Sequence, residues 1–413
     1  MNATQLKMLV PPPAELHATL CTVTERLARE LATPGSAAPD WSDEEWTIAR
    51  AVAAMHGISP LLSRALLWHG PPQWKAFLED QRTHTRVRHG RMHELLLSIG
   101  RNALEAGVPV TALKGAALHQ LGVYEAGDRP MADVDLLVRP ADVARTAALL
   151  SSLGFRQTSE SWKERVFTVI GDSAAAELGE HSANGLKIEL HERICERLPL
   201  QLTDVSGFVF PAEPRAGLNS YPSNGALMRH LLLHAAGSMA FQVLRILQLH
   251  DIALLAARMK EADWNELAVA KSPHSRMWWA YPPLEMLSRY YASSVPGHVL
   301  DALRLDCSHV LRALGGRRKS LTDVSYSYLW VKAFPGIEWS RSIAEVLGYA
   351  VSRVRPDAGH RASRKQLAAS QTWAKRSDWP TMSQSRRIVR WLSSRQTRPV
   401  TMHAITAAFA QAQ

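Results

Sequence analysis

The stretch from Val108 to Val138 constrains the fold of this chain more than any other. Its first part, Val108 to Leu113, is an apolar run that predicts a strand, and Lys114-Gly115-Ala116 then begins a helical pattern. A second strand is predicted from Met131 to Val138, and it carries Asp133 and Asp135. A turn between a strand and a helix therefore lies a short way before two carboxylates.

The two aspartates are predicted to share one face of their strand. Side chains alternate along a strand, so Asp133 and Asp135 point the same way, roughly 7 Å apart, while Val134 and Leu136 face a core. Two carboxylates that face one opening repel each other unless a cation lies between them. Mg²⁺, held by carboxylates and substrate phosphates, would supply that cation. The alternative is a solvated acidic pair on an exposed strand.

The turn at Lys114-Gly115-Ala116 has the character of a phosphate site. Amide N–H groups at a helix start attract anions, Gly115 allows close backbone approach, and Lys114 adds a positive charge. Arg129, four residues before Asp133, brings a second cation. The alternatives are a plain strand-to-helix turn with an exposed lysine, and an ion pair of Arg129 with Glu125 or Asp128.

A third carboxylate lies on Lys187-Ile188-Glu189-Leu190-His191. Alternation places Lys187, Glu189 and His191 on one face. If this strand lies beside that of Asp133, Glu189 completes a cup of three carboxylates. Such a cup suits two metal ions in an in-line displacement, with Glu189 placed to take the acceptor's proton. An edge strand with outward polar residues is the alternative.

These motifs together resemble the polymerase-β-type nucleotidyltransferase superfamily. The resemblance is closest to a largely uncharacterised family with a Lys-Gly turn before the Asp-x-Asp strand, and it covers roughly residues 45–300. It implies an α+β fold with a small mixed β-sheet flanked by helices, a bound nucleoside triphosphate, and Mg²⁺ (or Mn²⁺) on Asp133, Asp135 and Glu189.

The resemblance also implies a nucleotide-binding set and shows one departure. The set comprises Lys114, Gly115, Ala116, Arg129, His234, Arg245 and Asp251. The last three lie in a later helical block, and buried hydrogen-bonded roles are the alternative for them. The superfamily usually has Gly-Gly or Gly-Ser at the turn, whereas Ala116 follows Gly115 here. A hydroxyl that would bind phosphate is thus absent.

Four regions are predicted along the chain. They are an N-terminal helical region (1–106), the nucleotidyltransferase core (107–200), a helical domain (201–315) and a basic C-terminal extension (316–413). The last 63 residues carry 12 basic and 2 acidic side chains, which accounts for the whole net charge of +10. The predicted catalytic region therefore lies in a neutral body, and the high charge does not identify the whole chain as a nucleic-acid binder.

The basic tail has a predicted helix with Arg386, Arg387, Arg390, Trp391 and Arg395, preceded by Trp373, Lys375 and Arg376. Arginines interleaved with tryptophan can bind nucleic acid. Docking on an acidic partner, lying on a membrane surface, and packing of Trp391 on the body are the alternatives.

Composition favours a cytoplasmic protein. No apolar run is long enough to span a membrane, no secretory leader is visible, and three widely spaced cysteines suit a reducing compartment.

The predicted activity is transfer of a nucleoside monophosphate to an acceptor, with release of pyrophosphate. The acceptor stays open among a small molecule, a peptide or protein hydroxyl, and an RNA end. Two rival functions share parts of the pattern: a nucleotide-sugar glycosyltransferase, which also uses Asp-x-Asp, and a non-catalytic binding protein that keeps the fold.

Overall fold

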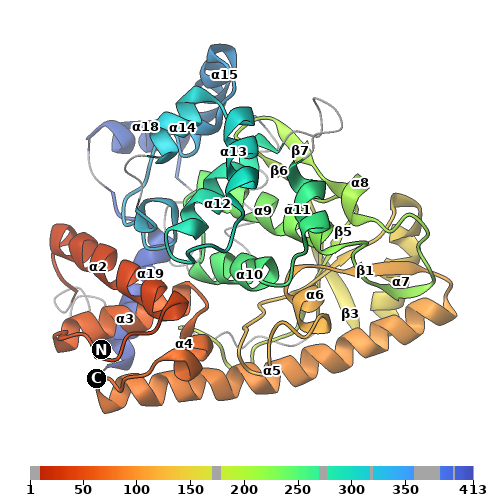
Figure 1. Cartoon of the computed structure of the whole chain (residues 1–413), viewed down its shortest axis with the longest axis horizontal. Helices are drawn as coiled ribbons and strands as arrows, with labels where there is room; N and C mark the ends of the chain where they lie inside the picture. Colours follow the sequence, from red (N-terminus) through yellow and green to blue (C-terminus); the bar gives the residue numbers. More distant parts are fainter. Residues whose placement is uncertain are drawn as a thin grey trace.

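The computed structural model describes residues 10–169, 178–268, 277–316, 320–357, 382–393 and 396–412. The chain is α+β, as predicted (Figure 1). The N-terminal region is helical and comprises α2 (Pro13–Ala32), α3 (Asp43–Met55), α4 (Ser59–Ala65) and α5 (Pro72–Glu105).

Local sequence signals explain where these helices begin and end. A capping box of Ser42 and Glu45 starts α3, and Gly57, with a φ of +67°, follows its end. Helix α5 begins with a proline in its first turn. This 34-residue helix runs along the lower edge of the molecule in Figure 1.

The central sheet is mixed and has six strands in the order β3-β4-β5-β2-β1-β8. Its strands are β1 (Pro109–Ala112), β2 (Val134–Leu137), β3 (Phe155–Glu160), β4 (Arg165–Val169), β5 (Lys187–His191) and β8 (Gly217–Asn219). Strand β2 pairs with β5 in parallel, so that Asp135 lies opposite Glu189. The strand of the third carboxylate therefore lies directly beside the aspartate strand, which is the arrangement that a cup of three carboxylates requires.

Short helices and a second small sheet surround these strands. They are α6 (Lys114–Gln120), the 3₁₀ turn η1 (Pro140–Asp142), α7 (Val143–Ser152), β6 (Cys195–Arg197), β7 (Leu202–Asp204) and α8 (Ser206–Val209).

The two faces of the sheet differ in character. Val134, Leu136, Ile188 and Leu190 are buried in a core that also includes residues of α5 and α7. Asp135 and Glu189 alternate with them and face the opposite side. The predicted division of these strands into an apolar and an acidic face is confirmed.

The opposite side is covered by a largely helical half. It contains α9 (Asn224–Ala240), α10 (Ile246–Ala256), α11 (Glu261–Ala268), η3 (Trp278–Ala280), α12 (Tyr281–Ser288), α13 (Gly297–Asp306) and α14 (His309–Gly316). The C-terminal part contains η4 (Thr322–Val324), η5 (Ile337–Trp339), α15 (Ile343–Val354), α18 (Gln384–Ser393) and α19 (Pro399–Gln411). Helices α2, α3, α9, α10 and α19 contribute to one hydrophobic core. Helix α19 packs against α3, near the N-terminus in Figure 1.

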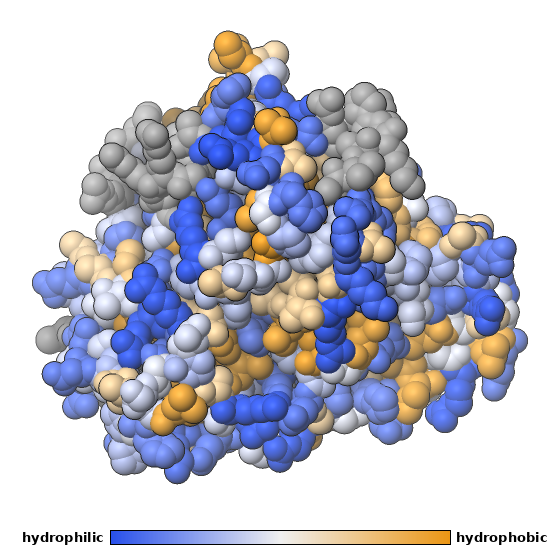
Figure 2. Space-filling view, viewed as in Figure 1, coloured by the Kyte–Doolittle hydropathy of each residue, from blue (hydrophilic) through white to orange (hydrophobic). Residues whose placement is uncertain are grey.

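Hydrophilic side chains cover much of the face in Figure 2, with apolar ones among them. An apolar cap at the top of this view lies over α15, where Ile343, Leu347 and Val351 are exposed. Across the described part of the chain, every helix is too short or too polar to cross a bilayer.

The tail helix is present as α18, and it packs on the body. Trp391 contacts Phe334, and the Arg353 guanidinium lies 5.3 Å from the centre of its ring. This geometry favours the packing alternative for Trp391. Residues Trp373, Lys375, Arg376 and Arg395 lie outside the described residues. Nucleic-acid binding by the tail stays a prediction.

A buried polar chain ties distant regions together at His56. The backbone N–H of Ile246 donates to Nδ1 of His56 at 3.0 Å, so the neutral ring carries its proton on Nε2. Nε2 lies 2.9 Å from Ser327 Oγ, which also accepts a bond from Thr24 at 2.7 Å. This chain joins α2, the end of α3, the start of α10 and the C-terminal region.

We predict that His56 makes folding sensitive to acid. Burial, with a smaller contribution from Arg245, lowers the pKa of His56 from 6.5 to about 3. Between pH 6.5 and pH 3 His56 therefore binds a proton in the unfolded chain but not in the folded chain. Its contribution to the free energy of unfolding is fully present above pH 6.5 and is lost progressively as the pH drops toward 3. Between pH 7 and pH 5 this group alone should remove about 2 kcal/mol from the free energy of unfolding.

Urea unfolding of wild-type protein and His56→Gln at both pH values tests this prediction. The variant should be less stable at pH 7 and should lose about 2 kcal/mol less than wild type on acidification. An identical loss in both proteins would contradict it.

Candidate functional site

A cleft of about 390 Å³ opens between the acidic face of the sheet and the helical half. It is lined by nine of the ten predicted site residues: Lys114, Gly115, Arg129, Asp133, Asp135, Glu189, His234, Arg245 and Asp251. The tenth, Ala116, is buried in the core of the sheet instead, and its N–H donates to the Leu113 carbonyl.

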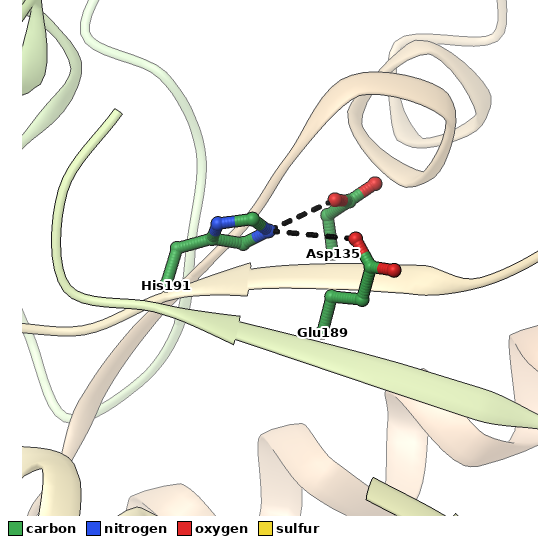
Figure 3. A group of neighbouring side chains, drawn as sticks. All are labelled: Asp135, Glu189 and His191. Carbon is green, nitrogen blue, oxygen red and sulfur yellow. Dashed lines mark hydrogen bonds and ion pairs between the residues drawn. The ribbon is translucent and has the colours of Figure 1, made fainter. Parts of the chain in front are cut away.

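Asp135 and Glu189, which line the cleft, form a cluster with the buried side chain of His191 (Figure 3). Nε2 of His191 lies 3.0 Å from an Asp135 oxygen and 3.9 Å from a Glu189 oxygen. One potential ligand atom from each residue lies within 4.8 Å of the others. Carboxylate oxygens and an imidazole nitrogen form a donor set that fits a divalent cation.

Asp133 lies nearer the edge of the acidic cluster than Asp135 does. The strand begins at Val134, so Asp133 precedes it, with a side chain that is 26% exposed, against 7% for Asp135. Asp133 contacts Lys187 rather than the buried cluster.

Two lysines form ion pairs with the three carboxylates. Nζ of Lys114 lies 2.7 Å from Asp135, and Nζ of Lys187 lies 2.6 Å from Glu189 and 3.0 Å from Asp133. Lys114 has a φ of +46°, an unfavourable conformation for a residue with a Cβ. The turn therefore holds a strained residue at the position where its ammonium reaches the acidic strand.

Burial and the neighbouring charges shift the pKa values of Asp135 and Glu189 in opposite directions. Burial would raise the pKa of Asp135, but Lys114 and His191 hold it well below its usual range. Burial, and then Asp133 and Asp135, raise the pKa of Glu189 from 4.5 to about 8. Burial works against both lysines, yet the surrounding carboxylates raise the pKa of each, so both stay charged at neutral pH.

Arg129 is fixed by a buried double hydrogen bond to Asp251. Its Nε and Nη2 donate to the two carboxylate oxygens at 2.8 and 2.7 Å, and the Tyr124 hydroxyl donates to one of them at 2.7 Å. The alternative pairing of Arg129 with Glu125 or Asp128 is wrong, because Arg64 binds both of these acids. The carboxylate of Asp251 thus serves to orient Arg129 at the wall of the cleft.

The last two predicted residues lie on the helical wall. His234 faces Glu196, with 3.6 Å between Nδ1 and Oε1, and burial followed by the charge of Lys114 lowers the pKa of the imidazole. Lys163 and His234 outweigh burial and lower the pKa of Glu196 to about 2. Arg245 lies over the Tyr326 ring, with 5.3 Å between its Cζ atom and the ring centre.

Four residues of the site were not predicted from the sequence to have a role in it: Lys163, Lys187, His191 and Tyr326. Strand alternation places Lys187 and His191 on the correct face, and this was the available signal for them. Lys163 lies in the turn between β3 and β4, and Tyr326 follows η4. Both lie outside strands and helices, where no periodicity marks which way a side chain points.

The contact between Gly115 and Arg129 gives a testable prediction. A Cβ at position 115 would collide with the Arg129 guanidinium and lie 3.0 Å from the Met131 sulfur. Gly115→Ala should therefore displace Arg129 and lower the free energy of unfolding by about 1–3 kcal/mol. Thermal and urea unfolding provide the measurement.

Gly90→Ala is the matched control. Position 90 is exposed inside α5, with no atom within 4 Å of an added Cβ. Alanine there should stabilise the protein by about 0.5–1 kcal/mol. Equal tolerance of both substitutions would show that the close approach of Arg129 to Gly115 is not required.

The geometry of the cleft agrees with the comparison to known proteins. Residues 42–275 match a family described as an uncharacterised nucleotidyltransferase, and this match covers more than half of the chain. Neither a functionally curated protein nor a solved structure gave a match. On this evidence the chain is a member of the uncharacterised nucleotidyltransferase family.

Proposed function

We propose that the cleft binds a nucleoside triphosphate with Mg²⁺ and transfers its nucleoside monophosphate to an acceptor, releasing pyrophosphate. One observation carries this proposal. Two carboxylates on adjacent parallel strands, and a third just before one of these strands, line the same cleft as Lys114, Arg129, Lys163 and Arg245. Acids that can bind a metal thus share one cleft with cations that can bind phosphates.

The acidic side of the cleft would hold the metal. Asp135 and Glu189 lie in the buried cluster, and Asp133 lies at its margin. When bound, a divalent cation neutralises charge on the triphosphate.

Lys114, Gly115 and Arg129 would hold the phosphates. The ammonium of Lys114 lies at the junction of the turn and Asp135, and Arg129 presents its guanidinium against the Cα of Gly115. Ala116 has no direct part in this grip because its side chain lies in the core. A side chain at this position points into the core, so the absence of a hydroxyl here does not remove a phosphate contact from the cleft.

The reaction would be an in-line displacement at the α-phosphorus. An acceptor oxygen forms a bond to that phosphorus, the bond to the oxygen that bridges the α- and β-phosphates breaks, and pyrophosphate leaves. The acceptor's proton would pass to Glu189 once this carboxyl group has lost its own proton, and its raised pKa then makes the carboxylate a stronger base. Lys114 and Arg129 would stabilise charge that builds on the phosphates.

The far wall would receive the nucleoside. Tyr326 offers an aromatic face with Arg245 over it, and such a pair suits stacking with a base. His234 lines the same wall, while Asp251 acts through Arg129. The acceptor, whether a small molecule, a peptide or protein, or an RNA end, would enter the same cleft.

Removing an acid should weaken metal-dependent nucleotide binding. In calorimetry with a non-hydrolysable triphosphate and Mg²⁺, we expect Glu189→Gln and Asp135→Asn to weaken binding at least about tenfold, because charge-paired contacts are worth more than about 1.4 kcal/mol. Asp80→Asn is the control, because this aspartate is 61% exposed on α5 and pairs with His84. It should bind like wild type.

Thermal unfolding of each variant separates lost binding from lost folding, and Glu189→Gln serves if Asp135→Asn unfolds. Equal affinity of wild type and both folded cleft variants would contradict the metal site. If label were transferred from a nucleotide sugar but not from any triphosphate, the result would instead support the glycosyltransferase activity.

A further inference from the structure

Lys187 lies where a cation between two of the carboxylates is expected. Its Nζ bridges Glu189 at 2.6 Å and Asp133 at 3.0 Å. Lys187 and Glu189 are two residues apart on β5, so the backbone directs both side chains to one face. The Lys187 side chain is 31% exposed, which places its ammonium at the margin of the cluster and not free in solvent.

The charges of the site support a single metal ion. When all three carboxyl groups are ionised, as metal binding requires, they carry three negative charges, and Lys114 and Lys187 together carry the charge of one divalent cation. Two lysines and one divalent ion carry the same positive charge as two divalent ions. One added ion therefore balances the three carboxylates of this site as well as two ions would balance three carboxylates that had no lysines beside them. A second ion between Asp133 and Glu189 would be repelled by the Lys187 ammonium, which already lies between these two carboxylates.

The donor atoms also favour one position for that ion. Asp135, Glu189 and His191 contribute two carboxylates and an imidazole that already lie within 4.8 Å of one another. Asp133 is outside this group and is bound to Lys187. The imidazole nitrogen is a donor that suits Mn²⁺ better than the hard, oxygen-preferring Mg²⁺.

We propose that the cleft binds one divalent cation through Asp135, Glu189 and His191, and that the Lys187 ammonium takes the place of a second cation between Asp133 and Glu189. This inference rests on the proposed function, because it concerns the same metal site. It differs from the three-carboxylate, two-metal arrangement expected from the sequence.

The number of bound Mn²⁺ ions tests the role of Lys187. With a non-hydrolysable triphosphate at saturation, Mn²⁺ titration followed by electron paramagnetic resonance should count one ion per wild-type chain. Lys187→Met keeps the length of the side chain but removes its charge, and it should bind a second ion. Lys187→Arg keeps the charge and should bind one. Two ions in wild type, or one in Lys187→Met, would overturn the role of Lys187.

The spectrum of the bound ion tests His191 independently. Pulsed measurements on the wild-type Mn²⁺ complex should show coupling to an imidazole nitrogen, and His191→Gln should lose that coupling. A folded wild-type complex without nitrogen coupling would overturn the ligand role of His191, while leaving metal-dependent transfer intact. Failure of the wild-type protein to bind any Mn²⁺ would overturn both this inference and the proposed function. Failure of the inference alone can thus be distinguished from failure of the proposed function.

Discussion

The ion pairs between three clustered carboxylates and two lysines are the interactions on which this structure depends. Asp135 and Glu189 are forced together by the parallel register of β2 and β5, and burial makes their mutual repulsion costly. Lys114 and Lys187 relieve that repulsion, and the strained backbone at Lys114 is consistent with this requirement. The same ammonium groups would then meet the phosphates of an incoming nucleotide, so one set of charges can serve both folding and binding.

The surrounding fold holds these charges at fixed positions. Asp251 on α10 orients Arg129, Gly115 leaves room for its guanidinium, and the sheet carries the acids on a rigid face. At the opposite end of the cleft wall, the start of α10 is tied through His56 to Ser327. The helical half and the sheet are therefore positioned by buried polar contacts as well as by apolar packing, and a cleft lies between them.

Much of this arrangement could be predicted from sequence because strands impose a strict alternation. The period of two identified the acidic face of Asp135, the matching face of Glu189 and the apolar residues between them. It could not show that β2 begins one residue after Asp133, which leaves that carboxylate at the margin. The partner of Arg129 lies 122 residues away, and Lys163 and Tyr326 lie outside strands and helices, so only tertiary structure brings them to the cleft. Lys187 and His191 were placed correctly, but their roles depend on distances that spacing does not contain.

The fate of the three phosphates tests the central claim most directly. The protein would be incubated with Mg²⁺ and a triphosphate labelled in parallel samples at the α- or γ-phosphate, together with extracted small molecules, peptides, proteins and RNA as acceptors. We expect the α-label to appear on an acceptor and the γ-label to appear in pyrophosphate, with both signals lost in Glu189→Gln. Transfer of the γ-label to an acceptor, or release of orthophosphate without any α-labelled product, would contradict nucleotidyl transfer at this cleft.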